Sequence, residues 1–300
     1  RTKIWDASVG AILTEVTPKI NFESNSLKGS MTTPVIFMAN NLFAQTIPIT
    51  RGWNWISLNV ESNESSQFDL LLKTLNSRTD DLVKGQKSHR IFKKSKTWKG
   101  SLEAMTPDNA YMLKSSVDDT LVIDGVLANP TTRLINLVKG WNWIGFNSIR
   151  NLPINQALGG LNPQNEDLIK GKDFFAVYDQ NIGWIGSLAA MKPGEGYLYK
   201  SGTSNSFYYP IAGYYKSGID NDALKNTHFN VQSDEFQSNM NMVAMLNCDG
   251  LDKDSKQTLA AFDNNGKCRG AIKLHYMNEI KSHLAFLSIA GDGSEELNFK

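Results

Sequence analysis

Gly52-Trp53-Asn54-Trp55-Ile56 returns later in the chain as Gly140-Trp141-Asn142-Trp143-Ile144. Three more stretches recur in the same order, namely 81–85 with 167–171, 98–102 with 184–188, and 111–115 with 197–201. Self-similarity over this length marks one small domain that has been duplicated. We therefore predict two homologous repeat modules, at residues 48–128 and 135–213.

The repeats carry the pattern of β-strands. Aromatic and β-branched residues alternate with polar ones, and Gly, Asn, Asp and Ser clusters interrupt them at short intervals. Because side chains two residues apart point the same way, Trp53 and Trp55 share one strand face, and Ile56 and Leu58 share the other. We expect a mostly β fold with short helices, made of two tandem β-rich repeats flanked by β-sandwich-like segments.

Local patterns also predict details within each repeat. Residues 68–75 have the apolar spacing of one helical face, which predicts a short helix packed on the sheet. The last strands are expected to form hairpins, with 111–115 pairing with 121–123 and 197–200 with 207–209. Gly194 and Gly196 are expected to supply positive φ in the turn of the second repeat.

Composition limits the possible partners. The 300 residues include 31 Lys and Arg against 30 Asp and Glu, so no net charge favours nucleic acid or acidic lipid. No apolar stretch reaches the roughly 18 residues of a membrane helix, so membrane insertion is not expected. Cys248 and Cys268 fit no zinc-ligand spacing; they form either one disulfide, in an oxidising compartment, or two buried free thiols.

The two flanks each look like half a domain. Residues 1–47 form a β segment with too little chain for its own core, and residues 220–300 form a β-sandwich-like domain that is incomplete alone. A sheet that lacks strands exposes unpaired backbone groups and invites added strands. We predict that both ends form one sheet, within the chain or between copies, through these residues: Ile4, Trp5, Val35, Phe37, Leu297 and Phe299.

The repeat motifs carry a resemblance. The Gly-Trp-Asn-Trp-Ile start and the finish at residues 193–198 (PGEGYL) resemble a module repeated in large secreted surface proteins of Bacteroidetes-like, type IX-secreting bacteria. The first repeat departs from this finish at residues 107–111 (PDNAY), where both glycines are missing. Ala261-Phe262 and residues 268–270 (CRG) resemble a second module of the same proteins. The resemblance implies an exported, extracellular setting and no catalytic residues to carry over.

Residues suited to catalysis or to metal binding are sparse. The four histidines are scattered, and none stands in a recognisable nucleophile motif, so we expect no enzymatic activity. Acidic turns at residues 249–254, 263–266 and 292–296 offer oxygen ligands that could hold Ca²⁺, although turn formation alone also explains them. No other cofactor or metal site is expected.

The tryptophans allow two interpretations. Aromatic faces stack on sugar rings, but a large aromatic side chain also stabilises a core strongly when it is buried. The Gly-Trp-Asn-Trp pairs are expected in the core, whereas Trp98 and Trp184 lie beside turn glycines and are expected to be more exposed. The candidates for glycan stacking are Trp98, Trp184, Tyr178 and Tyr199.

These observations favour a non-enzymatic structural or adhesive segment of a bacterial surface protein or filament, located outside the cell or on its surface. Its partners would be copies of itself, adjacent modules of the same polypeptide, or surface glycans. The alternative is a carbohydrate-binding accessory region of a secreted hydrolase.

Overall fold

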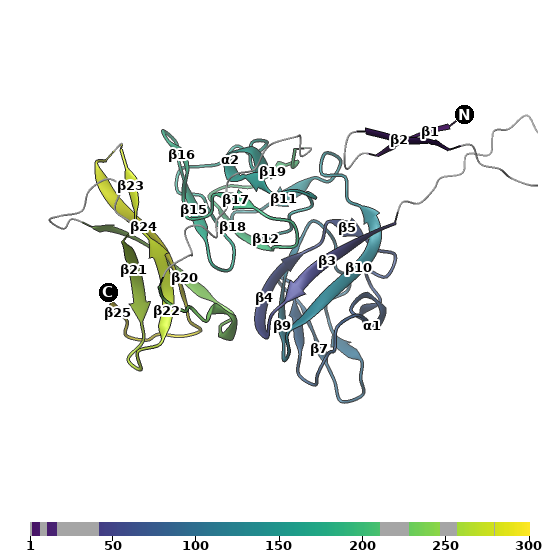
Figure 1. The fold of residues 1–300 in the computed structure, drawn as a ribbon, viewed down its shortest axis with the longest axis horizontal. Coiled ribbons are helices and arrows are strands. Elements are labelled where there is room, and N and C mark those ends of the chain that lie inside the picture. The colour runs from purple at the N-terminus through teal and green to yellow at the C-terminus, as the bar shows by residue number, and fades with distance from the viewer. Residues whose placement is uncertain (1, 7–10, 17–41, 211–227, 247–256, 279) are drawn as a thin grey trace, which may run out of the picture. The chain divides into compact units, whose positions relative to one another are not determined.

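The structure is a computed structural model that describes residues 2–6, 11–16, 42–210, 228–246, 257–278 and 280–300 (Figure 1). The chain divides into two compact units, Arg1–Ala39 and Asn40–Lys300. The fold is mostly β, with two short α-helices in the described residues, which confirms the predicted fold class.

The first unit contains a β-hairpin. Strand β1 (Thr2–Asp6) pairs antiparallel with β2 (Ala11–Val16). Ile4 lies opposite Thr14, and the register shifts between Ile4 and Trp5. An isolated two-stranded hairpin is only marginally stable in water.

Each repeat in the second unit is built on a five-stranded antiparallel sheet in which the first strand pairs with the last. In the first repeat the order is β4 (Gly52–Ser57), β9 (Ala110–Ser115), β6 (Leu82–Lys84), β7 (His89–Phe92) and β8 (Trp98–Gly100). In the second it is β12 (Gly140–Ile144), β18 (Tyr197–Ser201), β14 (Leu168–Lys170), β15 (Phe175–Asp179) and β16 (Gly183–Gly186). The identical strand order confirms the duplication.

Smaller sheets complete each repeat, and they correct the predicted hairpins. Strand β10 (Asp119–Leu127) pairs with β3 (Leu42–Ile49) and β5 (Val60–Glu61), not with β9. Likewise β19 (Asn205–Phe207) pairs with β11 (Ile135–Leu137), not with β18, and β13 (Leu152–Pro153) pairs with β17 (Ala190–Met191). The predicted hairpins cannot form because β9 is already paired with β4 and β6, and β18 with β12 and β14.

The pairing of β3 with β10 also sets where the first repeat begins. Residues 42–47, which the sequence assigned to the preceding β segment, share a sheet with the first repeat. Ile47 and Ile49 are buried in its core. Leu121 and Ile123 of β10 present their apolar side chains to the same core.

Each repeat carries one short helix, α1 (Phe68–Leu71) and α2 (Ile154–Ala157). Phe68 and Leu71 are buried against Val83 and Leu113 of the five-stranded sheet, which confirms the predicted helix packed on the sheet. The helix is a single turn, so its stability comes from this packing rather than from its own hydrogen bonds.

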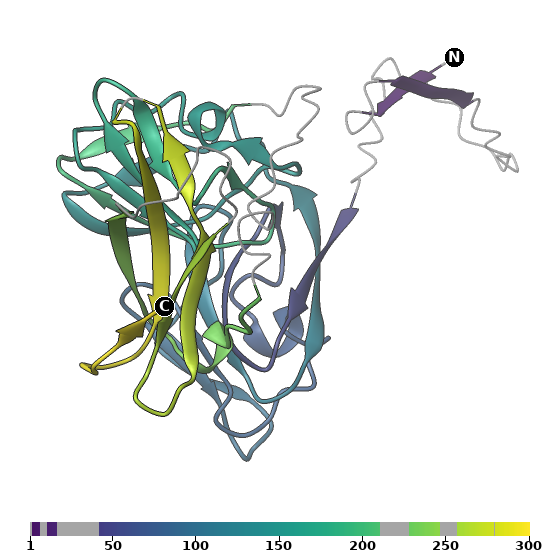
Figure 2. The same cartoon turned by 60° about the vertical axis from the view of Figure 1, so that its left-hand side comes forward.

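The C-terminal module has two three-stranded antiparallel sheets (Figures 1 and 2). One has the order β20 (Asn239–Leu246), β24 (Ser282–Ala290), β23 (His275–Met277), and the other β22 (Cys268–Lys273), β21 (Thr258–Phe262), β25 (Asn298–Phe299). A 3₁₀ turn, η1 (Ser233–Glu235), precedes β20. Buried Ala261, Ile272, Ala285 and Leu287 form the apolar layer of this sandwich-like module.

The residues predicted to join the chain ends lie in separate sheets. Ile4 and Trp5 belong to β1, and Phe299 of β25 pairs with Ala261 of β21 and is 46% exposed. Leu297 packs on the C-terminal core. Val35 and Phe37 lie outside the described residues, so joining of the two ends stays a prediction.

Candidate functional site: the junction of the repeats and the C-terminal module

The asparagine of the Gly-Trp-Asn-Trp motif closes the turn that precedes β4 in the first repeat and β12 in the second. These two strands carry the paired tryptophans and are called the Trp strands. Asn54 Oδ1 accepts a hydrogen bond from the Thr50 N–H (2.9 Å), and its Nδ2 donates to the Thr50 carbonyl (2.8 Å). Asn142 makes the same pair of bonds to Val138, both 2.8 Å long. The motif therefore fixes the entry of the strand, and with it the direction of both tryptophans.

The repeated tyrosine closes the turn at the other end of the module. Tyr111 Oη accepts a hydrogen bond from the Thr106 N–H, and Tyr197 Oη from the Lys192 N–H, both at 2.7 Å. Burial raises the pKa of both phenols, so they remain neutral. Each last strand is thereby tied to the loop that leads into it.

The two repeats pack through equivalent contacts. Ile56 of the first repeat forms a β-bridge with Glu195 of the second, and Ile144 of the second forms one with Asn109 of the first. Because Ile56 and Ile144 are equivalent positions, as are Asn109 and Glu195, the repeats exchange the same contact in both directions. This is the isologous pattern of a twofold dimer, built here within one chain.

Backbone hydrogen bonds reinforce both halves of this interface. The Ser57 N–H donates to the Gly194 carbonyl (3.0 Å), and the Gly145 N–H donates to the Asp108 carbonyl (2.9 Å). Gly194 has φ +85°, which confirms one of the two predicted positive-φ glycines. Such bonds hold the modules at a fixed spacing, because backbone atoms cannot rearrange as side chains do.

Gly196 is required for a different reason from the one predicted. Its φ is not positive; instead, a Cβ at Gly196 would lie 2.6 Å from the Ile56 carbonyl oxygen and 2.9 Å from the Cβ of Ala110. Ala110 is the equivalent residue of the first repeat. Because the Ala110 methyl group occupies this space, residue 196 must be a glycine, whereas the first repeat can carry alanine at the equivalent position.

Charged side chains fix the segment between the repeats. Arg133 forms a two-pronged ion pair with Asp108, through Nε (2.7 Å) and Nη2 (2.6 Å), and its Nη1 contacts Glu61 at 2.6 Å. The hydrogen bonds that the guanidinium donates to the Asp108 carboxylate raise the pKa of Arg133. The planar guanidinium fits a carboxylate in this two-bond geometry, so the connection is held rigidly.

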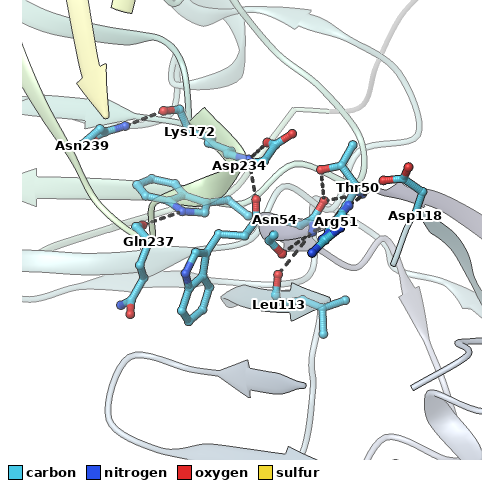
Figure 3. Close-up of polar contacts among 12 residues, drawn as sticks. Thr50, Arg51, Asn54, Leu113, Asp118, Lys172, Asp234, Gln237 and Asn239 are labelled. Carbon is cyan, nitrogen blue, oxygen red and sulfur yellow. Dashed lines mark hydrogen bonds and ion pairs between the residues drawn. The ribbon is translucent and has the colours of Figure 1, made fainter. Parts of the chain in front are cut away.

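The turn at residues 170–172 of the second repeat lies between the first repeat and the C-terminal module (Figure 3). Lys172 Nζ donates to the Trp53 carbonyl and pairs with the Asp234 carboxylate. Asn239 Nδ2 donates to the carbonyls of Lys172 (2.5 Å) and Gly171 (3.3 Å). All three modules therefore meet at this turn.

The C-terminal module also covers the first Trp strand directly. The Trp55 indole N–H donates to the Gln237 carbonyl at 3.3 Å (Figure 3). Gly52 has φ +102°, and a Cβ there would lie 2.1 Å from the Asp234 carbonyl oxygen. The glycine of the motif thus permits both the strained turn and the close approach of η1.

Lys170 connects the same three modules. Its ammonium lies 5.8 Å from the Trp55 ring and 5.2 Å from the Trp141 ring, and it donates to Asn239 O (3.1 Å) and Oδ1 (2.6 Å). Burial lowers the pKa of Lys170 to about 8, because the charged amine loses its hydration.

A cleft of about 410 Å³ opens between the two repeats beside this junction. Its apolar lining comes from Trp55, Ile47, Pro48, Phe174 and Pro193. Its charged lining comes from Lys172, Asp173, Lys192, Glu195 and Asp234. This mixed lining suits a small polar molecule better than an apolar one.

Two predicted glycan-stacking residues are buried, and their prediction is wrong. Trp98 is 3% exposed and packs edge-on against Phe92 in the core of the first repeat. Tyr199 is fully buried, and its hydroxyl donates to Asp167 Oδ2 at 2.7 Å. Neither ring offers a face to a sugar, because each strand turns its aromatic residue toward the module core.

The other two candidates for glycan stacking remain partly accessible to solvent. Tyr178 and Trp184 are partly exposed and pack edge to face, with ring centroids 5.3 Å apart. They lie opposite each other on β15 and β16.

The Gly-Trp-Asn-Trp pairs differ between the repeats. Trp53 and Trp55 are 6% and 7% exposed, which confirms their predicted burial. Trp143 is partly buried, but Trp141 is 41% exposed, so the prediction of a core position is wrong for Trp141. The motif is the same, and the difference lies in the η1 turn that packs on the first strand.

The remaining predicted sites are partly described. Cys268 is buried, and burial raises the pKa of its thiol, whereas Cys248 lies outside the described residues, so the disulfide stays a prediction. Asp263 accepts the N–H groups of Asn265 and Lys267, both at 2.9 Å, as a turn-forming aspartate does. Within the described ranges, no group of three His, Cys, Asp or Glu side chains could hold a metal ion.

Comparison of the chain with protein-family models, curated proteins and solved structures found no match. None of the helices in the described residues has the length and apolar character needed to cross a membrane.

We predict that Gly196→Ala lowers the free energy of unfolding by about 1–3 kcal/mol, because the new methyl group overpacks the contact between the repeats. Calorimetry should show the loss, whereas Gly293→Ala, where a Cβ meets no atom within 4 Å, should leave the melting temperature unchanged. Equal melting temperatures for both variants would contradict the close contact.

Trp98→Ala should lower the free energy of unfolding by about 3–5 kcal/mol, as expected for a large buried aromatic. Trp184→Ala should cost clearly less, because its ring is partly exposed. Denaturant titration of both variants measures the difference, and a smaller loss for Trp98→Ala would contradict its core position.

Lys170 should make stability depend on pH. Its folded pKa of about 8 lies below the ordinary value of 10.5, so the unfolded chain holds more protons between these values. The contribution of Lys170 to stability therefore rises with pH through that window, by up to about 3 kcal/mol. Denaturant titrations at several pH values should show wild type gaining on Lys170→Met as pH rises; a constant difference would contradict the lowered pKa.

Proposed function

We propose that this chain is a non-enzymatic, extracellular structural or adhesive segment of a bacterial surface protein or filament, built from rigid β modules. The observation that carries the proposal is the reciprocal backbone contact between the repeats, made by Ile56 with Glu195 and by Ile144 with Asn109. A flexible string of independent domains does not need such contacts, whereas a stiff segment does.

The packing of the third module supports the same function. Lys172, Trp55 and Lys170 each bond to the C-terminal module, so its position on the repeats is fixed by backbone carbonyls as well as by charges. Phe175 of the second repeat also packs edge-on against Phe286 of β24, with centroids 6.1 Å apart. Three modules held in this way would transmit force without bending.

Strand complementation would extend this segment into a larger assembly. In the proposal, the N-terminal residues Ile4, Trp5, Val35 and Phe37 complete the sheet that ends at Leu297 and Phe299, in the same chain or in a neighbouring copy. The short β25, which pairs with β21 over only two residues, supports this idea. Partners would then be copies of the chain or adjacent modules, and surface glycans.

The alternative function, a carbohydrate-binding accessory region of a secreted hydrolase, now rests on Tyr178 and Trp184. Their partly exposed rings are the favourable observation.

Deletion of residues 1–41 tests the proposal. If these residues complete a neighbouring copy, the full chain should form larger particles with rising concentration, visible by sedimentation and electron microscopy, and the deletion variant should stay monomeric. If they complete their own chain, the full chain should stay monomeric and the deletion should lower the melting temperature by several degrees. A variant identical to the full chain in both measurements would contradict strand complementation.

A further inference from the structure

The reciprocal packing of the repeats makes two of their surfaces equivalent. The Trp53 surface consists of Gly52, Trp53 and Trp55, and the Trp141 surface consists of Gly140, Trp141 and Trp143. The C-terminal module covers the first of these. Comparison of the two surfaces therefore shows which groups of the Trp141 surface a similar covering segment would contact.

The cover of the Trp53 surface has a definite chemistry. The Asp234 carbonyl packs on Gly52, and the Gln237 carbonyl accepts the Trp55 indole N–H at 3.3 Å. The Asp234 carboxylate pairs with Lys172. The ligand is therefore an acidic turn, residues 233–237 (SDEFQ), which presents two backbone carbonyls and a carboxylate.

The same groups on the Trp141 surface are open. Gly140 has φ +97°, and in the described part of the chain no heavy atom lies within 4 Å of where its Cβ would be. Trp141 is 41% exposed, and the Trp143 indole N–H has no hydrogen-bond partner among the described residues. An exposed tryptophan beside an unpaired donor is typical of a protein interface.

Positive charges surround this surface. Lys200 lies opposite Trp141 across the β12–β18 pair, and Lys139 stands two residues before Trp141; both are exposed. Lys170 Nζ lies 5.2 Å from the Trp141 ring. The exposed lysines favour a partner that carries carboxylates, because opposite charges across an interface steer and orient binding.

We propose that the Trp141 surface binds an acidic turn of a partner protein, in the way that the Trp53 surface binds residues 233–237. The backbone of the partner packs on Gly140, one of its carbonyls accepts the Trp143 indole N–H, and its carboxylates lie against Lys139 and Lys200. The site does not depend on filament formation, since it exists on each single chain.

A labelled synthetic peptide with the sequence of residues 230–238 is a suitable probe, because it carries the turn that the equivalent surface binds. Fluorescence anisotropy with the full chain should give saturable binding. Trp141→Ala and Lys200→Glu should each weaken it by about tenfold or more. Lys94→Glu, the same charge change at an exposed position between β7 and β8, is the matched control and should bind like wild type.

A peptide with Asn and Gln in place of the acids at positions 234 and 235 should bind more weakly than the original. The proposal is overturned if the chain does not bind the peptide, or if Trp141→Ala and Lys200→Glu both bind it as wild type does, since the peptide would then compete for the Trp53 surface. Self-association of the chain that Trp141→Ala abolishes would also overturn it, because a second copy would then occupy the site.

Discussion

Close approach of two backbones holds the repeats together. At two pairs of equivalent interface positions, one repeat has a glycine and the other a small side chain: Gly196 against Ala110, and Gly145 against Ser57. A Cβ at Gly145 would lie 2.2 Å from the Pro107 carbonyl oxygen. The Ser57 hydroxyl, on the other side, donates to the Glu195 carbonyl at 2.7 Å and accepts the Phe146 N–H. Duplication first produces identical surfaces, and these differences let them pack tightly.

The position of the third module follows from that contact. Because the repeats are locked, the turn at residues 170–172 reaches the Trp53 strand and provides a bonding surface for Asn239 and Asp234. The equivalent turn of the first repeat reaches the other Trp strand in the same way: Gln86 Nε2 donates to the Trp141 carbonyl at 2.8 Å, and its Oε1 accepts the Trp143 N–H. Lys172 pairs with the Asp234 carboxylate, whereas the equivalent residue of the first repeat is the neutral Gln86, so the positive charges beside the Trp141 surface come from other lysines, Lys139 and Lys200.

These features connect the proposed role to the geometry. A structural or adhesive segment needs modules that keep their spacing and surfaces that meet partners. Here the same motif serves both needs, since its asparagine and glycine shape the strand entry in either repeat. Only the surroundings decide whether its tryptophans stabilise the inside of the molecule or remain available at its surface.

The sequence alone determined the features that depend on neighbouring residues or on repetition: the duplication, the β character, a short packed helix within residues 68–75, and the positive φ of Gly194. The structure ends that helix at Leu71, earlier than the apolar pattern indicated. Tertiary structure decided the rest. The pairing of β9 and β18 on both sides excluded the expected hairpins, and the inward turn of β8 buried Trp98 although a glycine follows nearby. The environment of Trp53 and Trp141 could not be read from identical motifs, because burial depends on which distant segment packs there. The residue that accepts the Trp55 indole N–H lies 182 positions away in sequence.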